Sequence, residues 1–193
     1  MKRLYAILFV IAGIALASSS ASAQMMNNGS MMKENPMVGG AAMLPSKTIV
    51  ANAMNSADHT TLVAAVKAAG LVDTLNSAGP FTVFAPTNSA FDQLPAGTVN
   101  TLLKPENKSM LNNVLTYHVV AGKYDSKALA KLIKKGHGKA WLKTVSGGTL
   151  TAMMDGGNIV LRDRKGGTST VTTADVYQSN GVIHVIDNVL MPS

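Results

Sequence analysis

Apolar residues recur at intervals of three and four along the first part of the chain, which is the spacing of a helix with one buried face. In "HTTLVAAVKAAG", residues 59–70, the pattern predicts a helix with Asp58 as N-cap and Gly70 at its end. In "PENKSMLNNVLTYHV", residues 105–119, Pro105 suits the first turn of another helix. The residues expected to face inward are Leu62, Ala65, Val66 and Ala69 in the first helix, and Met110, Leu111, Val114 and Leu115 in the second.

A third segment, "DSKALAKLIKKG" at residues 125–136, predicts a strongly amphipathic helix that Asp125 caps. Leu129, Leu132 and Ile133 are expected to face the interior. Four lysines fall on the outer side: Lys127, Lys131, Lys134 and Lys135. Two interpretations of these lysines stay open, a solvated helix face and a patch that attracts an anionic glycan or a membrane surface.

The pattern changes to short runs rich in β-branched and aromatic residues at 81–85, "FTVFA", and again from residue 140 onward. The later runs are "AWLKTV", "TLTAMM", "NIVLRD", "STVTTADVY" and "GVIHVIDNVLM", separated by Gly-Gly, Asp-Gly-Gly-Asn and Asn-Gly turn signals. Helices therefore come first and an antiparallel meander follows. This segregation predicts an α+β fold rather than a doubly wound parallel sheet.

The first 23 residues have the pattern of a secretory signal peptide, with Lys2 and Arg3, an apolar run at 4–17 and Ala21-Ser22-Ala23 before the cleavage point. Residues 24–46 are rich in Met, Asn and Gly without a period, which predicts a flexible leader before a domain at 47–193. Their paired methionines are soft ligands of the kind Cu(I) prefers, or simply part of a low-complexity segment. No later segment is apolar enough to cross a membrane. We expect a secreted protein, periplasmic or extracellular.

The formal net charge of +7 includes two basic residues of the signal peptide, and without them 15 basic residues face 10 acidic ones. This balance favours anionic partners. Nucleic acid is not expected, because with Trp141 as the sole tryptophan the chain lacks the interleaved aromatics of a base-stacking surface. The absence of cysteine excludes thiol nucleophiles, thiolate metal ligands and disulfides.

Motifs of common enzymes and metal sites are missing. There is no Gly-x-Ser-x-Gly turn and no nucleotide-binding glycine loop. The four histidines, at 59, 118, 137 and 184, form no His-x-x-x-His pair, and the aspartates do not follow a calcium-loop spacing. We therefore expect a protein that is not an enzyme, with no catalytic residues, no cofactor and no metal site, and an uncharacterised hydrolase stays open as an alternative that no motif supports.

His118 and His184 each lie in an otherwise apolar run, "LTYHVVAG" and "NGVIHVIDNVL". They are either parts of a site or core residues. A buried imidazole must keep a hydrogen-bond partner or lose about 1–3 kcal/mol per unsatisfied atom. The core interpretation is favoured, with each ring neutral and holding a backbone carbonyl or a hydroxyl.

Three stretches carry a resemblance to a known family: "GPFTVFAPTNSAF" at 79–91, "LTYHVV" at 115–120 and "NGVIHVIDNVLMP" at 180–192. In this order they resemble the fasciclin domain family over residues 47–192. The resemblance implies a wedge of mainly antiparallel strands packed against several helices, and adhesion to a cell surface or extracellular matrix. The implied partners are extracellular protein, matrix or cell-surface glycan. The alternative is a soluble exported protein that binds an anionic glycan or a small molecule.

The resemblance also implies two partner-binding elements. One is a Tyr-His pair flanked by branched aliphatic residues, which corresponds here to Tyr117 and His118 with Leu115 and Val119. The other is an Asp-Ile pair, which corresponds to Asp175 and Val176. Exposure decides between the interpretations: if His118 is buried, the first element is structural, and a partner must contact its aliphatic neighbours or the lysine-rich helix.

Overall fold

The computed structural model describes residues 35–192, so the predicted signal peptide and the paired methionines lie outside the described residues. The helices are α1 (Ile49–Ala53), α2 (Thr60–Ala69), α3 (Val72–Asn76), α4 (Asn88–Asp92), α5 (Thr98–Leu102), α6 (Lys108–Tyr117) and α7 (Ser126–Lys135), with 3-10 turns η1 (Ala57–His59) and η2 (Pro105–Asn107). The strands are β1 (Met37–Val38), β2 (Ala41–Ala42), β3 (Phe81–Pro86), β4 (Val119–Ala121), β5 (Lys139–Lys143), β6 (Thr149–Asp155), β7 (Asn158–Arg162), β8 (Thr168–Gln178) and β9 (Gly181–Ile186). None of these helices is long and apolar enough to cross a membrane.

Helices α2 and α6 form where the helical spacing predicts them, with two differences. The inward residues of α2 are buried, and Gly70 ends the helix with a left-handed φ of 73°. Asp58 is not the N-cap of α2, because it lies inside η1, which runs directly into the helix. On α6, Met110 does not face inward: it is 55% exposed, and only the other three predicted positions are covered.

Seven strands form one sheet in the order β4-β3-β9-β8-β7-β6-β5. All neighbours pair antiparallel except β3 and β9, which run parallel from Phe81 opposite Gly181 to Pro86 opposite Ile186. Strands β5 to β8 form the meander that the turn signals predict. The α+β fold with a mainly antiparallel sheet is therefore confirmed.

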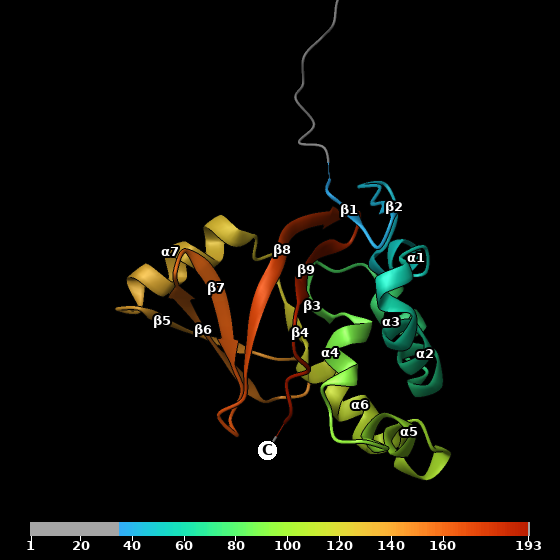
Figure 1. The fold of residues 1–193 in the computed structure, drawn as a ribbon. Helices are drawn as coiled ribbons and strands as arrows, with labels where there is room; N and C mark the ends of the chain where they lie inside the picture. Colours follow the sequence, from blue (N-terminus) through green and yellow to red (C-terminus); the bar gives the residue numbers. More distant parts are fainter. Residues whose placement is uncertain (1–34, 193) are drawn as a thin grey trace, which may run out of the picture. The chain divides into compact units, whose positions relative to one another are not determined.

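The described residues bury their apolar side chains in two clusters. The first lies between helices α1 to α6 and one face of β3 and β9, and the second lies between α7 and the strands β5 to β8. Figure 1 shows this division, with α7 against β5–β7 and the other helices on the opposite side of the central strands. Every residue of β9 is buried, because Ile183 and Val185 face the first cluster and Ile186 faces the second.

Part of the predicted leader belongs to the fold. Strands β1 and β2 pair as a hairpin, and Val38 and Met43 are buried in the first cluster. The turn between them is Gly39-Gly40, with φ of 57° and 73°, which is a two-residue hairpin signal. The folded region thus begins before Ser46, the residue at which the low-complexity composition predicts the end of the leader.

Candidate functional site

The Tyr117-His118 element is the junction between α6 and β4. Tyr117 is the last residue of α6, and its hydroxyl donates to the Thr149 carbonyl at 2.9 Å. Its ring lies against Gly148 so closely that a Cβ there would be 2.6 Å from a ring carbon. Tyr117 therefore ties the end of α6 to the turn between β5 and β6.

His118 bridges two backbone segments that are far apart in the sequence. Its Nδ1 lies 2.8 Å from the Val114 carbonyl, and the Leu190 N–H donates to its Nε2 at 3.0 Å. Because the carbonyl can only accept and the amide can only donate, the ring carries its proton on Nδ1. His118 thereby fastens the last turn of α6 to the segment that follows β9.

His184 makes the corresponding bridge with the opposite tautomer. Its Nε2 lies 2.8 Å from the Tyr124 carbonyl, and the Asp175 N–H donates to its Nδ1 at 3.3 Å. The ring stacks on Phe84 with 5.6 Å between ring centroids. His184 therefore fastens the loop before α7 to the sheet, as the core interpretation predicted.

Both histidines are held neutral. Burial lowers the pKa of His118 from its ordinary 6.5 to about 4, and burial also lowers the pKa of His184. A second proton on either ring would point an N–H at another N–H. Neither ring has a free lone pair for a general base, because the accepting nitrogen is already occupied.

Asp175 and Val176 lie where β8 bulges against β9. Asp175 has a left-handed φ of 62°, which aims its carboxylate at the start of α7. Both carboxylate oxygens accept from Ser126, one from its N–H and one from its hydroxyl, each at 2.6 Å. Val176 is buried in the first cluster. Asp175 therefore holds the first residue of α7 against the sheet, and Val176 belongs to the core.

The structure thus places all six predicted partner-binding residues in the interior. Their exposed fractions run from 1% to 9%. They are Leu115, Tyr117, His118, Val119, Asp175 and Val176. A folded partner has no access to these side chains while the domain keeps this structure.

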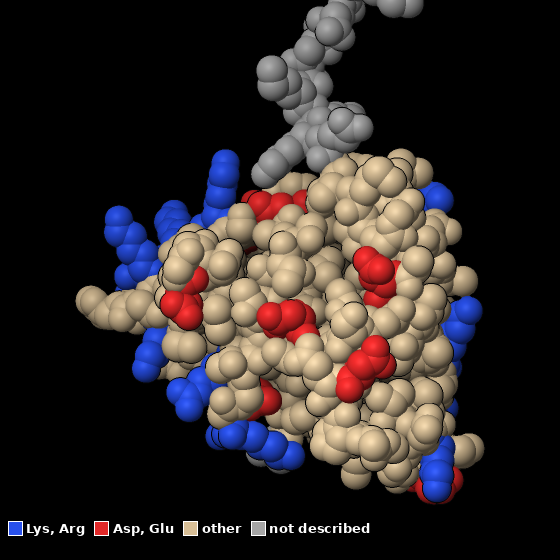
Figure 2. Space-filling model, viewed as in Figure 1, with Lys and Arg blue, Asp and Glu red and all other residues tan. Residues whose placement is uncertain are grey.

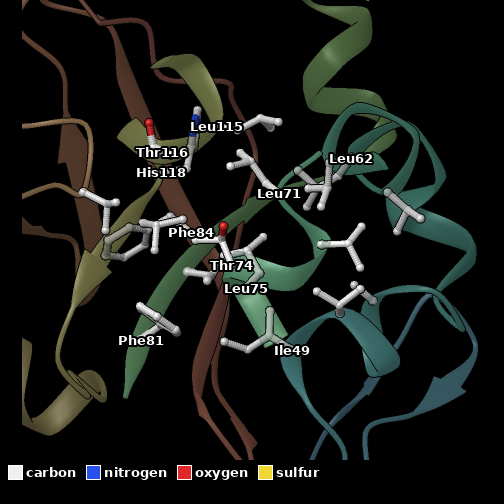
Figure 3. A pocket seen from close by; sticks show the side chains of 18 of the residues that line it. Ile49, Leu62, Leu71, Thr74, Leu75, Phe81, Phe84, Leu115, Thr116 and His118 are labelled. Atoms are coloured by element: carbon white, nitrogen blue, oxygen red, sulfur yellow. The ribbon is translucent and has the colours of Figure 1, made fainter. Parts of the chain in front are cut away.

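Three of the six line an apolar cavity between α1, α2, α3 and the α6–β4 junction. Figure 3 shows Ile49, Leu62, Leu75, Phe81 and Leu115 around it, with His118 at one end. Its volume is about 60 Å³, well below the roughly 300–1,000 Å³ of typical ligand pockets. Since both nitrogens of His118 have backbone partners, the ring offers the cavity only carbon. A small apolar group fits this cavity, and a sugar does not.

A family model described as the Fasciclin domain matches residues 57–192. The chain belongs to the fasciclin domain family. Protein sll1483 of Synechocystis sp. is 47% identical over 160 residues, which cover 83% of this chain and 82% of that protein. The cell surface glycolipoprotein MPB83 of Mycobacterium bovis is 34% identical over 159 residues, covering 80% of this chain and 64% of that one.

The fold is shared with a solved structure, the FAS1 domain pair from the insect cell adhesion molecule Fasciclin I. The TM-score is 0.67 at 22% identity, and the match covers 75% of this chain and 51% of that pair. This fasciclin domain therefore spans about half of the pair.

The lysines of α7 are the predicted residues that this fasciclin domain exposes. Lys127, Lys131, Lys134 and Lys135 all face solvent, while Leu129 and Ile133 on the opposite side of the helix are buried. Within residues 35–192 the one ion pair joins Lys104 and Glu106, so no carboxylate of the described part neutralises these lysines. Figure 2 shows basic side chains projecting around this side of the molecule.

Sequence reasoning missed a second exposed group. Trp141 stands on β5 with Lys139 and Lys143 on the same face, because side chains two apart in a strand point the same way. The alternation in "KAWLK" was the available signal. The described residues hold no cluster of three His, Cys, Asp or Glu side chains suited to a metal ion.

Proposed function

We propose that this fasciclin domain is an exported, non-enzymatic recognition module that adheres to a cell surface or extracellular matrix. Its partner is an anionic glycan, which it contacts through the four lysines of α7. The observation that carries the proposal is the lysine face itself, four exposed cations without a carboxylate partner in the described part of the chain. Such a face attracts a polyanion through many weak, salt-sensitive contacts.

The relatives and the N-terminal pattern support the location. One relative is by name a cell surface glycolipoprotein, and the shared fold occurs in an insect cell adhesion molecule. The signal-peptide pattern at 1–23 supports export. Support for a non-enzymatic role comes from His118 and His184, whose accepting nitrogens are both engaged by backbone amides.

Retention on an immobilised acidic polysaccharide at low and at high salt tests the proposal. We expect retention at low salt that is lost as salt rises. The test variant replaces Lys127, Lys131, Lys134 and Lys135 by Gln. The matched control replaces four exposed lysines elsewhere by Gln, namely Lys47, Lys67, Lys104 and Lys108, and so changes the net charge equally.

The α7 variant should lose most of its retention and the control little. Equal losses would show that only net charge matters, and no retention at low salt would end the proposal. Saturable binding to cells or matrix, in addition to retention, separates an adhesion module from a soluble glycan-binding protein. The apolar cavity does not favour a small-molecule function, because its volume is only about 60 Å³.

A further inference from the structure

The outer face of β5–β7 brings an aromatic side chain and cations together. Trp141 pairs across the sheet with Thr151, and Thr151 pairs with Arg162. Directly opposed side chains on one face of a sheet are about 5 Å apart. Trp141 and Arg162 are therefore two such spacings from each other, with Thr151 between them. Lys139 and Lys143 flank Trp141 on the same face.

Trp141 is 68% exposed, although it is the largest side chain of the protein. Burial of a tryptophan is a major source of stability, and a tryptophan left in solvent forgoes most of it. The inner face of the same strand carries Ala140 and Leu142, which pack in the second cluster without it. The fold therefore does not require a tryptophan at this position.

A shallow hollow of about 290 Å³ adjoins the ring. Its cations are Lys139, Arg162 and Arg164, and its only acid is Asp163. That carboxylate is already engaged, since one oxygen accepts from the Gly167 N–H at 2.7 Å and the other from the Met191 N–H at 3.0 Å. The hollow thus holds three cations against one acid, which is a net positive charge beside an aromatic face.

We propose that this hollow binds an acidic saccharide unit. A pyranose ring stacks its C–H face on the Trp141 indole, and its carboxylate or sulfate group pairs with the Arg162 guanidinium, whose planar fork suits a two-oxygen anion. The inference rests on the proposed function for the class of partner, but it assigns recognition to residues other than the α7 lysines.

Protection of the sheet edge and contact with a membrane each account for less of this face. Lysines on an edge strand discourage pairing with another sheet, and β5 is an edge strand. Edge protection accounts for Lys139 and Lys143, but not for an exposed Trp141 or an arginine two strands inward. A membrane surface would need several exposed apolar side chains beside the ring, whereas Thr151 lies directly opposite it across β6, Thr149 lies diagonally on one side, and Met153, diagonally on the other side, is half-buried.

Trp141 is the only tryptophan in the chain, so its fluorescence reports this hollow directly. The probes are a galacturonic acid hexamer, a sulfated hexamer of the same length and the carboxyl-reduced neutral hexamer. We expect saturable shifts of the emission to shorter wavelength, and protection of the ring from acrylamide quenching, with the acidic hexamers only.

Three variants locate the site. Arg162→Gln should weaken binding about tenfold, the loss expected when a charge-assisted contact is removed. Lys67→Gln, which removes one exposed charge on α2, should leave the affinity for the acidic hexamers unchanged. The affinity of Arg162→Lys for the acidic hexamers should lie between that of Arg162→Gln and that of the unaltered protein. An unchanged thermal midpoint of each variant shows that the fold is kept.

The outcomes separate the two proposals. If the protein is retained on the acidic polysaccharide, or binds the acidic hexamers by calorimetry, while Trp141 emission does not change, the hollow is not the site. The α7 lysines then carry the function alone. If anionic phospholipid vesicles shift the emission and the hexamers do not, the face binds membrane and the inference is overturned. If neither polysaccharide retention nor any emission shift occurs, both proposals fail.

Discussion

The two sides of this fasciclin domain differ in where they place the residues that stand out in the sequence. The helical side, α1 to α6 with β3, β4 and β9, buries its distinctive polar residues, including His118. The strand side, β5 to β8 with α7, exposes Trp141, Arg162 and the α7 lysines. The motif by which the sequence resembles its family therefore lies in hydrogen-bonded interior contacts, and the chemistry suited to a partner lies on the other side.

This difference has a physical cause. A polar side chain inside the core must find a partner of fixed position, so His118 needs the Val114 carbonyl and the Leu190 amide together. An exposed lysine or tryptophan has water as its partner and is free of that constraint. Substitutions should therefore change stability on the helical side and binding on the strand side.

The largest effect is expected for His118→Ala. It leaves the Val114 carbonyl and the Leu190 amide without partners and enlarges the apolar cavity, at a cost of about 3–5 kcal/mol. Urea denaturation followed by circular dichroism measures the free energy of unfolding. Trp141→Ala is the control and should change it by about 0.5 kcal/mol or less. If the two variants lost equal stability, the distinction between the two sides would be wrong.

The second largest effect is expected for acidification, which should lower the free energy of unfolding through the buried histidines. The neutral His118 ring takes up its second proton with a pKa of about 4 in the folded protein and near 6.5 in the unfolded protein. Between these two pH values the unfolded state therefore binds more protons than the folded state. The contribution of His118 to the free energy of unfolding is fully present above about pH 6.5. It falls by about 3 kcal/mol as the pH drops to about 4, with further loss from His184 because its pKa is lowered too.

Urea denaturation between pH 7 and pH 4 measures this loss. The control is the variant that replaces the four α7 lysines by Gln, which leaves both buried histidines and their hydrogen-bond partners in place. It should show the same pH dependence as the unaltered protein. A flat stability profile would mean that His118 is free to take up a proton in the folded state.

Much of the fold was predictable from the sequence, because α2, α6, α7 and the β5–β8 meander follow local periodicity and turn chemistry. That His118 and His184 are hydrogen-bonded core residues could be predicted, since an imidazole in a buried apolar run needs a hydrogen-bond partner. Their partners were not, because Leu190 and Tyr124 are 72 and 60 residues away in the chain. The hollow beside Trp141 was missed because it depends on the register of three strands.

Tyr117→Phe should lower the free energy of unfolding by less than His118→Ala or acidification does. The ring stays packed on Gly148, and only the hydroxyl that donates to the Thr149 carbonyl is removed, at a cost of about 1 kcal/mol. Tyr177→Phe is the matched control, because its hydroxyl makes a longer contact, 3.4 Å to Asp125, at a less buried position. Thermal unfolding should show the larger decrease for Tyr117→Phe, and the reverse order would contradict the assigned role of Tyr117.

The smallest effect has the opposite sign. Val119 lines the apolar cavity, so Val119→Ile adds one methylene to about 60 Å³ of empty space and should stabilise the domain by about 0.5–1 kcal/mol. Val182→Ile makes the same chemical change in β9, where the side chain is fully buried and lines no described cavity. There the extra methylene must displace neighbours, which costs about 1–3 kcal/mol. Because the two variants differ only in local space, chemical denaturation of the pair tests the cavity itself: a loss of stability in both would show that its walls are too rigid to admit even one carbon.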